Sequence, residues 1–149
     1  MTPSDLEWAG WDGFLENRGF DAIEDYRDLS CGQPISSWGV EDRCVVERIM
    51  TSIERERDRP FFVMAWTTQT HHPYEPTPHV PVLNFRREPI DDDYDLGRYL
   101  NVLHETDRHL ARLFEFLRKS GLADNTLVVV TGDHGQAFGY PHTSYMQGR

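Results

Sequence analysis

The sequence predicts an α/β fold with a mostly parallel sheet, and three segments carry this prediction. Residues 61–66 (FFVMAW) and 127–130 (LVVV) are short apolar runs without alternation, as is typical of strands covered on both faces. Residues 93–120 between them repeat apolar positions with helical spacing. The order strand, helix, strand favours a right-handed parallel crossover within one sheet.

Two helices are indicated by their spacing and their ends. Val45, Ile49 and Ile53 recur every fourth residue after Glu41, and this helix should end before Pro60. The residues expected to share one face of the second helix are Tyr99, Leu103, Thr106, Leu110, Leu113 and Leu117. The acidic run at 91–93 suits its N-terminal end, and the glycine at 121 suits the position just after its C-terminus.

The other segments are predicted to be loops. Residues 1–37 contain irregularly spaced aromatics with at most one short helix, and prolines at 73, 76, 78 and 81 exclude a helix through about residue 89. Residues 80–85 could supply an edge strand at most. Because strands buried on both faces need neighbours, we expect residues 1–149 to form a single, partial α/β domain, incomplete in this chain.

Composition excludes several classes of function. The chain has 15 Lys and Arg against 25 Asp and Glu, a net charge of −10, which excludes an extended nucleic-acid contact surface. An anionic small substrate remains possible because a bound cation reverses the local field. No segment has the length of a membrane span and the N-terminus lacks a signal-peptide pattern. Cys31 and Cys44 are too few for a disulfide scaffold, so compartment and oligomeric state are left open.

Polar residues follow both predicted strands. Residues 67–74 (TTQTHHPY) come after the first strand and residues 131–135 (TGDHG) after the second. In open α/β sheets, ligands bind at the carboxyl ends of the parallel strands. Histidines and a carboxylate should therefore meet at one rim of the sheet.

Asp133 and His134 are the candidate metal ligands. Adjacent side chains point to opposite faces of a strand, so both can reach one ion only where the backbone turns, and Gly132 and Gly135 permit such a turn. Aspartate oxygen with imidazole nitrogen suits zinc, manganese or iron. The alternative is a helix-capping aspartate beside an incidental surface histidine.

His71, His72 and His142 are candidates for binding an anion. Both His71 and His72 precede Pro73, which predicts an extended segment with diverging side chains, so that only one faces the site. The functional interpretation is a hydrogen bond from imidazole to a phosphoryl or sulfuryl oxygen. The alternative is a turn with solvated histidines, and His142 has the same two interpretations. Trp38 is expected to be a packing residue.

Four segments of the sequence resemble a known family. Residues 127–139 (LVVVTGDHGQAFG) resemble the C-terminal metal motif of the sulfatase branch of the alkaline phosphatase superfamily. Residues 70–74 (THHPY) are similar to its substrate-side His-x-Pro segment, and residues 19–21 and 38–42 (WGVED) resemble the lipoteichoic acid synthase-like subgroup. These segments are spread over residues 19–139, together with residues 99–126, which follow the order of the family's long helix and strand entry.

The resemblance implies a fold, a site and an activity. The fold would be part of an alkaline phosphatase-like three-layer domain. Asp133 and His134 would bind one divalent ion, Ca²⁺ or Mn²⁺ in the first place and Mg²⁺ or Zn²⁺ otherwise, and His71 and His142 would contact the sulfate or phosphate group. The activity would be metal-dependent hydrolysis of sulfate esters. One alternative is a phosphoglycerol or phosphoethanolamine transferase, and another is a non-catalytic, truncated paralogue acting as a binding module.

The resemblance assigns no nucleophile to this chain. The family's nucleophile, a Cys or Ser in a Cys/Ser-x-Pro-x-Arg segment or a Thr in the synthases, is expected upstream of the residues that align. Cys31 is followed by GQP and Cys44 lies in a predicted helix, so neither fits. We therefore expect the chain to supply the metal and substrate half of a site and to be inactive alone, with a parent protein that is exported or membrane-attached.

Overall fold

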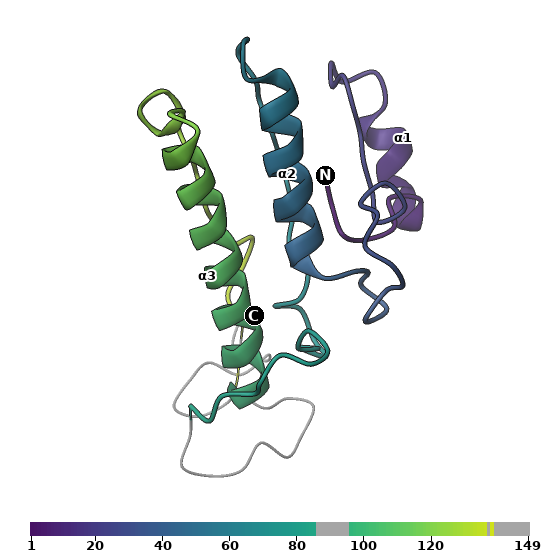
Figure 1. The fold of residues 1–149 in the computed structure, drawn as a ribbon. Helices are drawn as coiled ribbons and strands as arrows, with labels where there is room; N and C mark the ends of the chain where they lie inside the picture. Colours follow the sequence, from purple (N-terminus) through teal and green to yellow (C-terminus); the bar gives the residue numbers. More distant parts are fainter. Residues whose placement is uncertain (86–95, 137, 139–149) are drawn as a thin grey trace.

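A computed structural model describes residues 1–85, 96–136 and 138. Its elements in chain order are η1 (Trp8–Gly10), α1 (Trp11–Leu15), α2 (Asp42–Glu56), α3 (Leu96–Lys119) and η2 (Ala123–Asn125). Helices α2 and α3 lie side by side, and α1 lies on the other side of α2 (Figure 1). Both predicted helices are thus confirmed, although the residues before Leu96, including the acidic run, lie outside the described ones.

The core between α2 and α3 contains the predicted Ile53, Leu113 and Leu117, together with Val46, which the predicted spacing did not include. Val46 and Ile53 of α2 pack against Leu113 and Leu117 of α3, and all four are buried. A second cluster, on the side of α2 toward the N-terminal loops, contains Leu29, Val40, Cys44 and Val45. Because α2 contributes buried residues to both clusters, it is the central helix of the described residues.

Helix α3 ends at Lys119, and Gly121 lies just after its C-terminus, as predicted. Its φ of +72° is a left-handed conformation that glycine adopts without a steric penalty. The N–H of Gly121 donates to the Arg118 carbonyl (3.2 Å) and that of Leu122 to the Leu117 carbonyl (2.9 Å), which is the Schellman pattern. Leu122 then packs on the α2–α3 core, so the chain reverses into residues 127–130.

The predicted face of α3 is wrong in its N-terminal half. Leu103 is exposed, whereas Val102 and the polar Asn101 and Glu105 are buried. The reason is that this half packs against an irregular loop whose backbone needs partners. The Asn101 side chain accepts a hydrogen bond from the Leu83 N–H (2.7 Å) and donates one to the Leu83 carbonyl (2.9 Å). It thus satisfies the two backbone groups that a neighbouring strand would otherwise bind.

The two predicted strands are extended, but no β-ladder forms within the residues that the structure describes. Phe61 and Val128 face the α2–α3 core, whereas Phe62 (77% exposed) and Leu127 (88% exposed) face away from it. The expectation of burial on both faces is therefore wrong for this chain. Helices α2 and α3 cover one face, and the other is exposed except near Trp66, whose ring lies 5.2 Å from that of Trp11 in α1.

One neighbour of the first extended segment is visible along its edge. The Met1 amino group donates to the Met64 carbonyl (2.9 Å), and the Trp66 N–H donates to the Met1 carbonyl (3.1 Å). These two bonds have the pattern of a parallel pair. The Pro3 carbonyl then accepts the Val40 N–H (3.1 Å), so residues 1–3 lie between the extended segment and the loop before α2.

Cys31 and Cys44 form a disulfide, with their Cα atoms 5.9 Å apart. It joins the loop before α2 to the first turn of that helix. Sequence analysis found no pattern for this pair, because only the folded loop brings the two residues together. No helix of the described segments has the length and apolar character needed to span a membrane.

Candidate metal and anion site

Asp133 and His134 lie in a bend directly after the second extended segment, as predicted from Gly132 and Gly135. One Asp133 oxygen, Oδ1, accepts the His134 backbone N–H (2.9 Å). The other, Oδ2, lies 3.6 Å from Nε2 of His134. Both side chains are exposed, at 88% for Asp133 and 65% for His134. The bend thus turns an oxygen and a nitrogen of adjacent residues toward each other.

The geometry of this pair fits a divalent cation. Nδ1 of His134 lies 2.9 Å from the Gly135 carbonyl oxygen, and since a carbonyl only accepts, Nδ1 carries a proton, so that Nε2 is the ring nitrogen available to a metal ion in the neutral ring. Metal-binding histidines are commonly held in this way by a backbone carbonyl. Two ligand atoms each about 2.1 Å from one ion lie roughly 3.0–3.4 Å apart, close to the spacing seen between Nε2 and Oδ2.

A full coordination shell is not assembled by the described residues. Within residues 1–85, 96–136 and 138, no group of three or more His, Cys, Asp or Glu side chains could hold a metal ion. His71 therefore does not join Asp133 and His134 in one ligand set. His142, the fourth residue predicted for the site, lies outside the described residues.

His71 and His72 lie in a turn rather than in the extended segment that was predicted. The His71 N–H donates to the Thr68 carbonyl (2.9 Å), and the Tyr74 N–H donates to the His71 carbonyl (2.9 Å). Nδ1 of His71 lies 2.8 Å from the His72 carbonyl oxygen, so Nδ1 is the donor and Nε2 points elsewhere. The His72 ring instead meets the edge of Tyr74 at 5.7 Å. The two rings diverge, as expected.

Trp38 is a packing residue, as expected, but its partner His71 was not predicted. Its ring packs against that of His71 with centroids 3.8 Å apart, so it shapes the surroundings of the candidate anion ligand. The Trp38 carbonyl accepts from the Ser4 hydroxyl (2.6 Å), and Gly39 follows it with φ +124°. A Cβ at Gly39 would lie 1.8 Å from the Pro3 carbonyl oxygen, so only glycine allows this approach.

An aromatic cluster joins the two polar segments. Phe138, three residues after Gly135, lies 5.8 Å from Tyr74, three residues after His71, measured between ring centroids. Tyr99 of α3 contacts both, at 4.9 Å from Phe138 and 5.5 Å from Tyr74. The segments that follow the two extended stretches therefore converge on one end of α3, as the prediction of a common rim requires.

Comparison with known proteins decides the family. The sulfatase family model matches residues 1–148. The chain belongs to the sulfatase family. This sulfatase-family chain is thus part of the sulfatase branch of the alkaline phosphatase superfamily, as its motifs indicated, and its fold class is α/β. The sheet itself is not formed within the segments described above.

Curated relatives of this sulfatase-family chain are large proteins. Phosphoglycerol transferase I of Xanthomonas campestris pv. campestris is 30% identical over 139 residues, which cover 88% of this chain and 19% of the relative. Phosphoglycerol transferase I of Xanthomonas euvesicatoria pv. vesicatoria is 27% identical over 137 residues, with the same coverage. The lipoteichoic acid synthase-like protein YvgJ of Bacillus subtilis is 25% identical over 129 residues, or 83% of this chain and 19% of the relative.

The chain spans about a fifth of the length of these curated relatives. No solved structure matches it significantly.

Proposed function

We propose that this chain provides the metal-binding and ester-binding part of a phosphoglycerol transferase-type enzyme. The observation that carries the proposal is the pairing of Asp133 Oδ2 with Nε2 of His134, whose other ring nitrogen is held by the Gly135 carbonyl. Relatives named phosphoglycerol transferase favour this activity over the sulfate-ester hydrolysis expected first, which stays a prediction. Both activities act on anionic esters.

The proposed ion is Mn²⁺ or Ca²⁺, as the family resemblance implies, with Mg²⁺ and Zn²⁺ as alternatives. A carboxylate oxygen and an imidazole nitrogen bind manganese or zinc readily, whereas calcium and magnesium would need further oxygen ligands from elsewhere. When bound, the ion would supply Lewis acidity that polarises the ester oxygens. Asp133 and His134 would hold it.

His71 is proposed to bind the anionic group of the ester. Because Nδ1 donates to the His72 carbonyl, only Nε2 can reach a ligand, and Nε2 donates a hydrogen bond only when the ring is protonated. An imidazolium next to a phosphoryl oxygen forms a charge-assisted hydrogen bond. Trp38, packed on the same ring, would limit its rotation and exclude water from one of its faces. His142 stays a second proposed anion ligand.

We assign no nucleophile among the described residues. Cys31 and Cys44 form the disulfide, so neither thiol is available for a covalent step. The transfer step is therefore proposed for the longer proteins of this family, with this chain binding and orienting the ester. The alternative outside the enzyme class is a non-catalytic binding module.

The metal proposal is tested by titrating the chain with Mn²⁺ and following paramagnetic broadening of NMR signals. We expect broadening around residues 132–135, and Asp133→Ala combined with His134→Ala should weaken binding by at least about tenfold, since even second-shell residues of metal sites contribute about 10–100-fold. Asp124→Ala, an exposed carboxylate in η2, is the matched control. Unchanged affinity in the double variant would refute the site.

The substrate proposal is tested by adding sn-glycerol 1-phosphate or methyl sulfate to the Mn²⁺-loaded chain. Tighter binding of the phosphate ester supports the transferase, and tighter binding of methyl sulfate supports the sulfatase. His71→Ala should weaken binding of the phosphate ester, because it removes the proposed hydrogen-bond donor. Unchanged affinity in His71→Ala would argue against His71 as the donor.

A further inference from the structure

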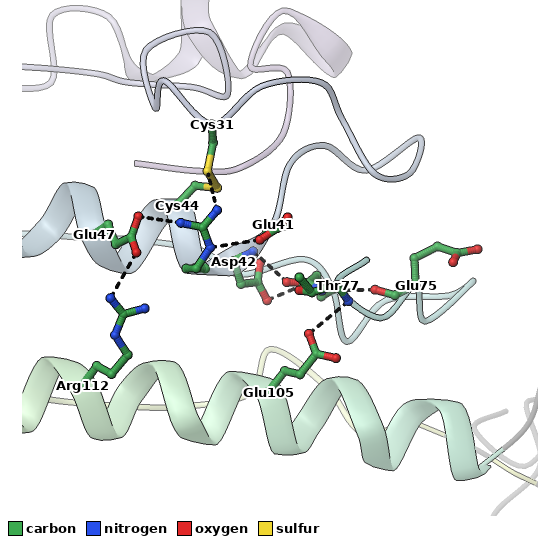
Figure 2. Close-up of polar contacts among 11 residues, drawn as sticks. Cys31, Glu41, Asp42, Cys44, Glu47, Glu75, Thr77, Glu105 and Arg112 are labelled. Atoms are coloured by element: carbon green, nitrogen blue, oxygen red, sulfur yellow. Dashed lines mark hydrogen bonds and ion pairs between the residues drawn. A yellow bond between two sulfur atoms is a disulfide. The ribbon is translucent and has the colours of Figure 1, made fainter. Parts of the chain in front are cut away.

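Three buried polar side chains surround the loop that carries His71. Asp42 (0% exposed), Gln69 (6%) and Glu105 (5%) come from the first turn of α2, from the loop itself and from α3. Figure 2 shows Thr77 of this loop between Asp42 and Glu105. Burying a carboxylate costs free energy unless hydrogen bonds satisfy it, so the partners of these groups reveal what they hold.

Asp42 and Gln69 bind each other's backbone in a reciprocal way. The Asp42 carboxylate accepts the Thr68 N–H at Oδ1 (2.8 Å) and the Gln69 N–H at Oδ2 (3.2 Å). In return, Oε1 of Gln69 accepts the Asp42 N–H (2.8 Å), which is one of the N–H groups that a helix N-terminus leaves without an internal partner. The start of α2 is thus tied to the loop by three hydrogen bonds.

The far end of the loop is tied by the remaining groups. Nε2 of Gln69 donates to the Glu75 carbonyl (3.1 Å) and to Oγ1 of Thr77 (3.4 Å). The Thr77 N–H donates to Oε2 of Glu105 on α3 (3.1 Å). Gln69 therefore bridges the two ends of the segment 67–77, and Glu105 anchors that segment to the second helix.

His71 lies within the segment enclosed by these contacts. Its N–H donates to the carbonyl of Thr68, the same residue whose N–H binds Asp42. Thr68 therefore connects the Asp42 carboxylate, through its N–H, with the turn that carries the His71 imidazole, through its carbonyl. The ring rests against Trp38, whose carbonyl also accepts from the Thr68 hydroxyl (3.4 Å). A shift of residue 68 would move the ring relative to Trp38.

We propose that Asp42, Gln69 and Glu105 form a buried clamp that positions the His71 imidazole against Trp38. They are positioning residues, because none of them touches the proposed ester. The inference rests on the proposed role of His71, although the clamp itself can be measured without any ligand. An apolar contact could fill the same space, but it could not satisfy the backbone N–H groups of an irregular loop.

The first test is NMR of the full chain without ligand. The carbon-bound ring protons of His71 should be displaced by the ring current of Trp38, and Glu105→Ala or Gln69→Ala should return them toward the values of an unstructured histidine. Glu105→Gln is the matched control, because its amide oxygen can still accept from the loop and should keep the wild-type signals. The methyl signals of Leu117 report whether the α2–α3 core is intact.

Unchanged ring signals of His71 in folded Gln69→Ala and Glu105→Ala chains would overturn the clamp. If one alanine variant loses the native Leu117 methyl signals, the His71 ring signals of the other variant are compared with those of wild type, and this comparison decides whether the clamp exists. If both do, the single change Thr77→Pro replaces them. It removes the N–H that binds Glu105 and the hydroxyl that accepts from Gln69, and unchanged His71 signals there would again refute the proposal.

The second test links the clamp to the site through the affinity for inorganic phosphate. Gln69→Ala should weaken binding by about tenfold, the scale of one charge-assisted hydrogen bond, but by less than about twofold in a His71→Ala background. Equal effects in both backgrounds would show that Gln69 acts independently of His71. If wild-type chain binds no phosphate, the proposed function fails while the NMR comparison still decides the clamp.

Discussion

Replacing Asp42 by asparagine should change how the stability of the protein depends on pH. Burial raises the pKa of the Asp42 carboxyl from 3.8 to about 6, although the backbone N–H groups of Thr68 and Gln69 favour the ionised form. The negative charge of Glu105 contributes to this raised pKa of Asp42. Asparagine has nearly the same shape and does not titrate, so it removes this one ionisation and keeps an oxygen in the clamp.

The sign of the effect follows from proton binding. The folded state holds the Asp42 proton more tightly than the unfolded state does, so the contribution of this group to stability is greatest below about pH 4. It is lost as the pH rises from about 4 to about 6. At about 1.4 kcal/mol for each pKa unit, the difference between 3.8 and about 6 corresponds to about 3 kcal/mol.

The assay is urea unfolding of wild type and Asp42→Asn at several values between about pH 3 and about pH 7. The difference in free energy of unfolding should change by about 3 kcal/mol over this range, with wild type losing stability relative to the variant as the pH rises. Carboxylates such as Glu24, whose pKa is lowered by hydrogen bonds from Arg48, act in the opposite direction but cancel in the difference. A constant difference would refute the reasoning.

Three further changes test other parts of the fold. Cys31→Ser with Cys44→Ser should lower the free energy of unfolding by about 3 kcal/mol, because the bond spans 13 residues, and reductant should have the same effect on wild type but none on the variant. Gly39→Ala should cost at least about 2 kcal/mol in the same assay, because its Cβ would collide with backbone; a neutral effect would contradict the close approach. His109→Leu should stabilise, most strongly near pH 5, because burial lowers the pKa of His109 and the wild type loses stability below about pH 6.5; pH-independent stabilisation would exclude this cause.

Elements that depend on local spacing could be predicted from the sequence. The burial of Val45 and Ile53 in α2 and the end of α3 at Gly121 depend on residues within one or two turns, and the structure confirms them, although the two α2 side chains pack in different clusters. The N-terminal face of α3 could not be predicted in this way. Asn101 and Glu105 are buried because of loop backbone more than 15 residues away, which leaves no periodic signal in the helix.

The candidate site also has local features that the sequence predicted and long-range contacts that it did not. The TGDHG motif determined the bend and the proximity of Asp133 to His134, since both depend on neighbouring residues and flanking glycines. The contact between His71 and Trp38 joins residues 33 positions apart and was visible only in the structure. The buried clamp was missed for the same reason.

The sequence alone therefore determined the family motifs, the two helices and the local geometry of Asp133 and His134, because each depends on short-range spacing and backbone preference. Only the tertiary structure decided which side chains hold the His71 loop, that Cys31 and Cys44 are joined, and that the extended segments are covered on a single face. These features depend on contacts between distant segments. Such contacts form where buried backbone groups find partners, whatever their separation along the chain.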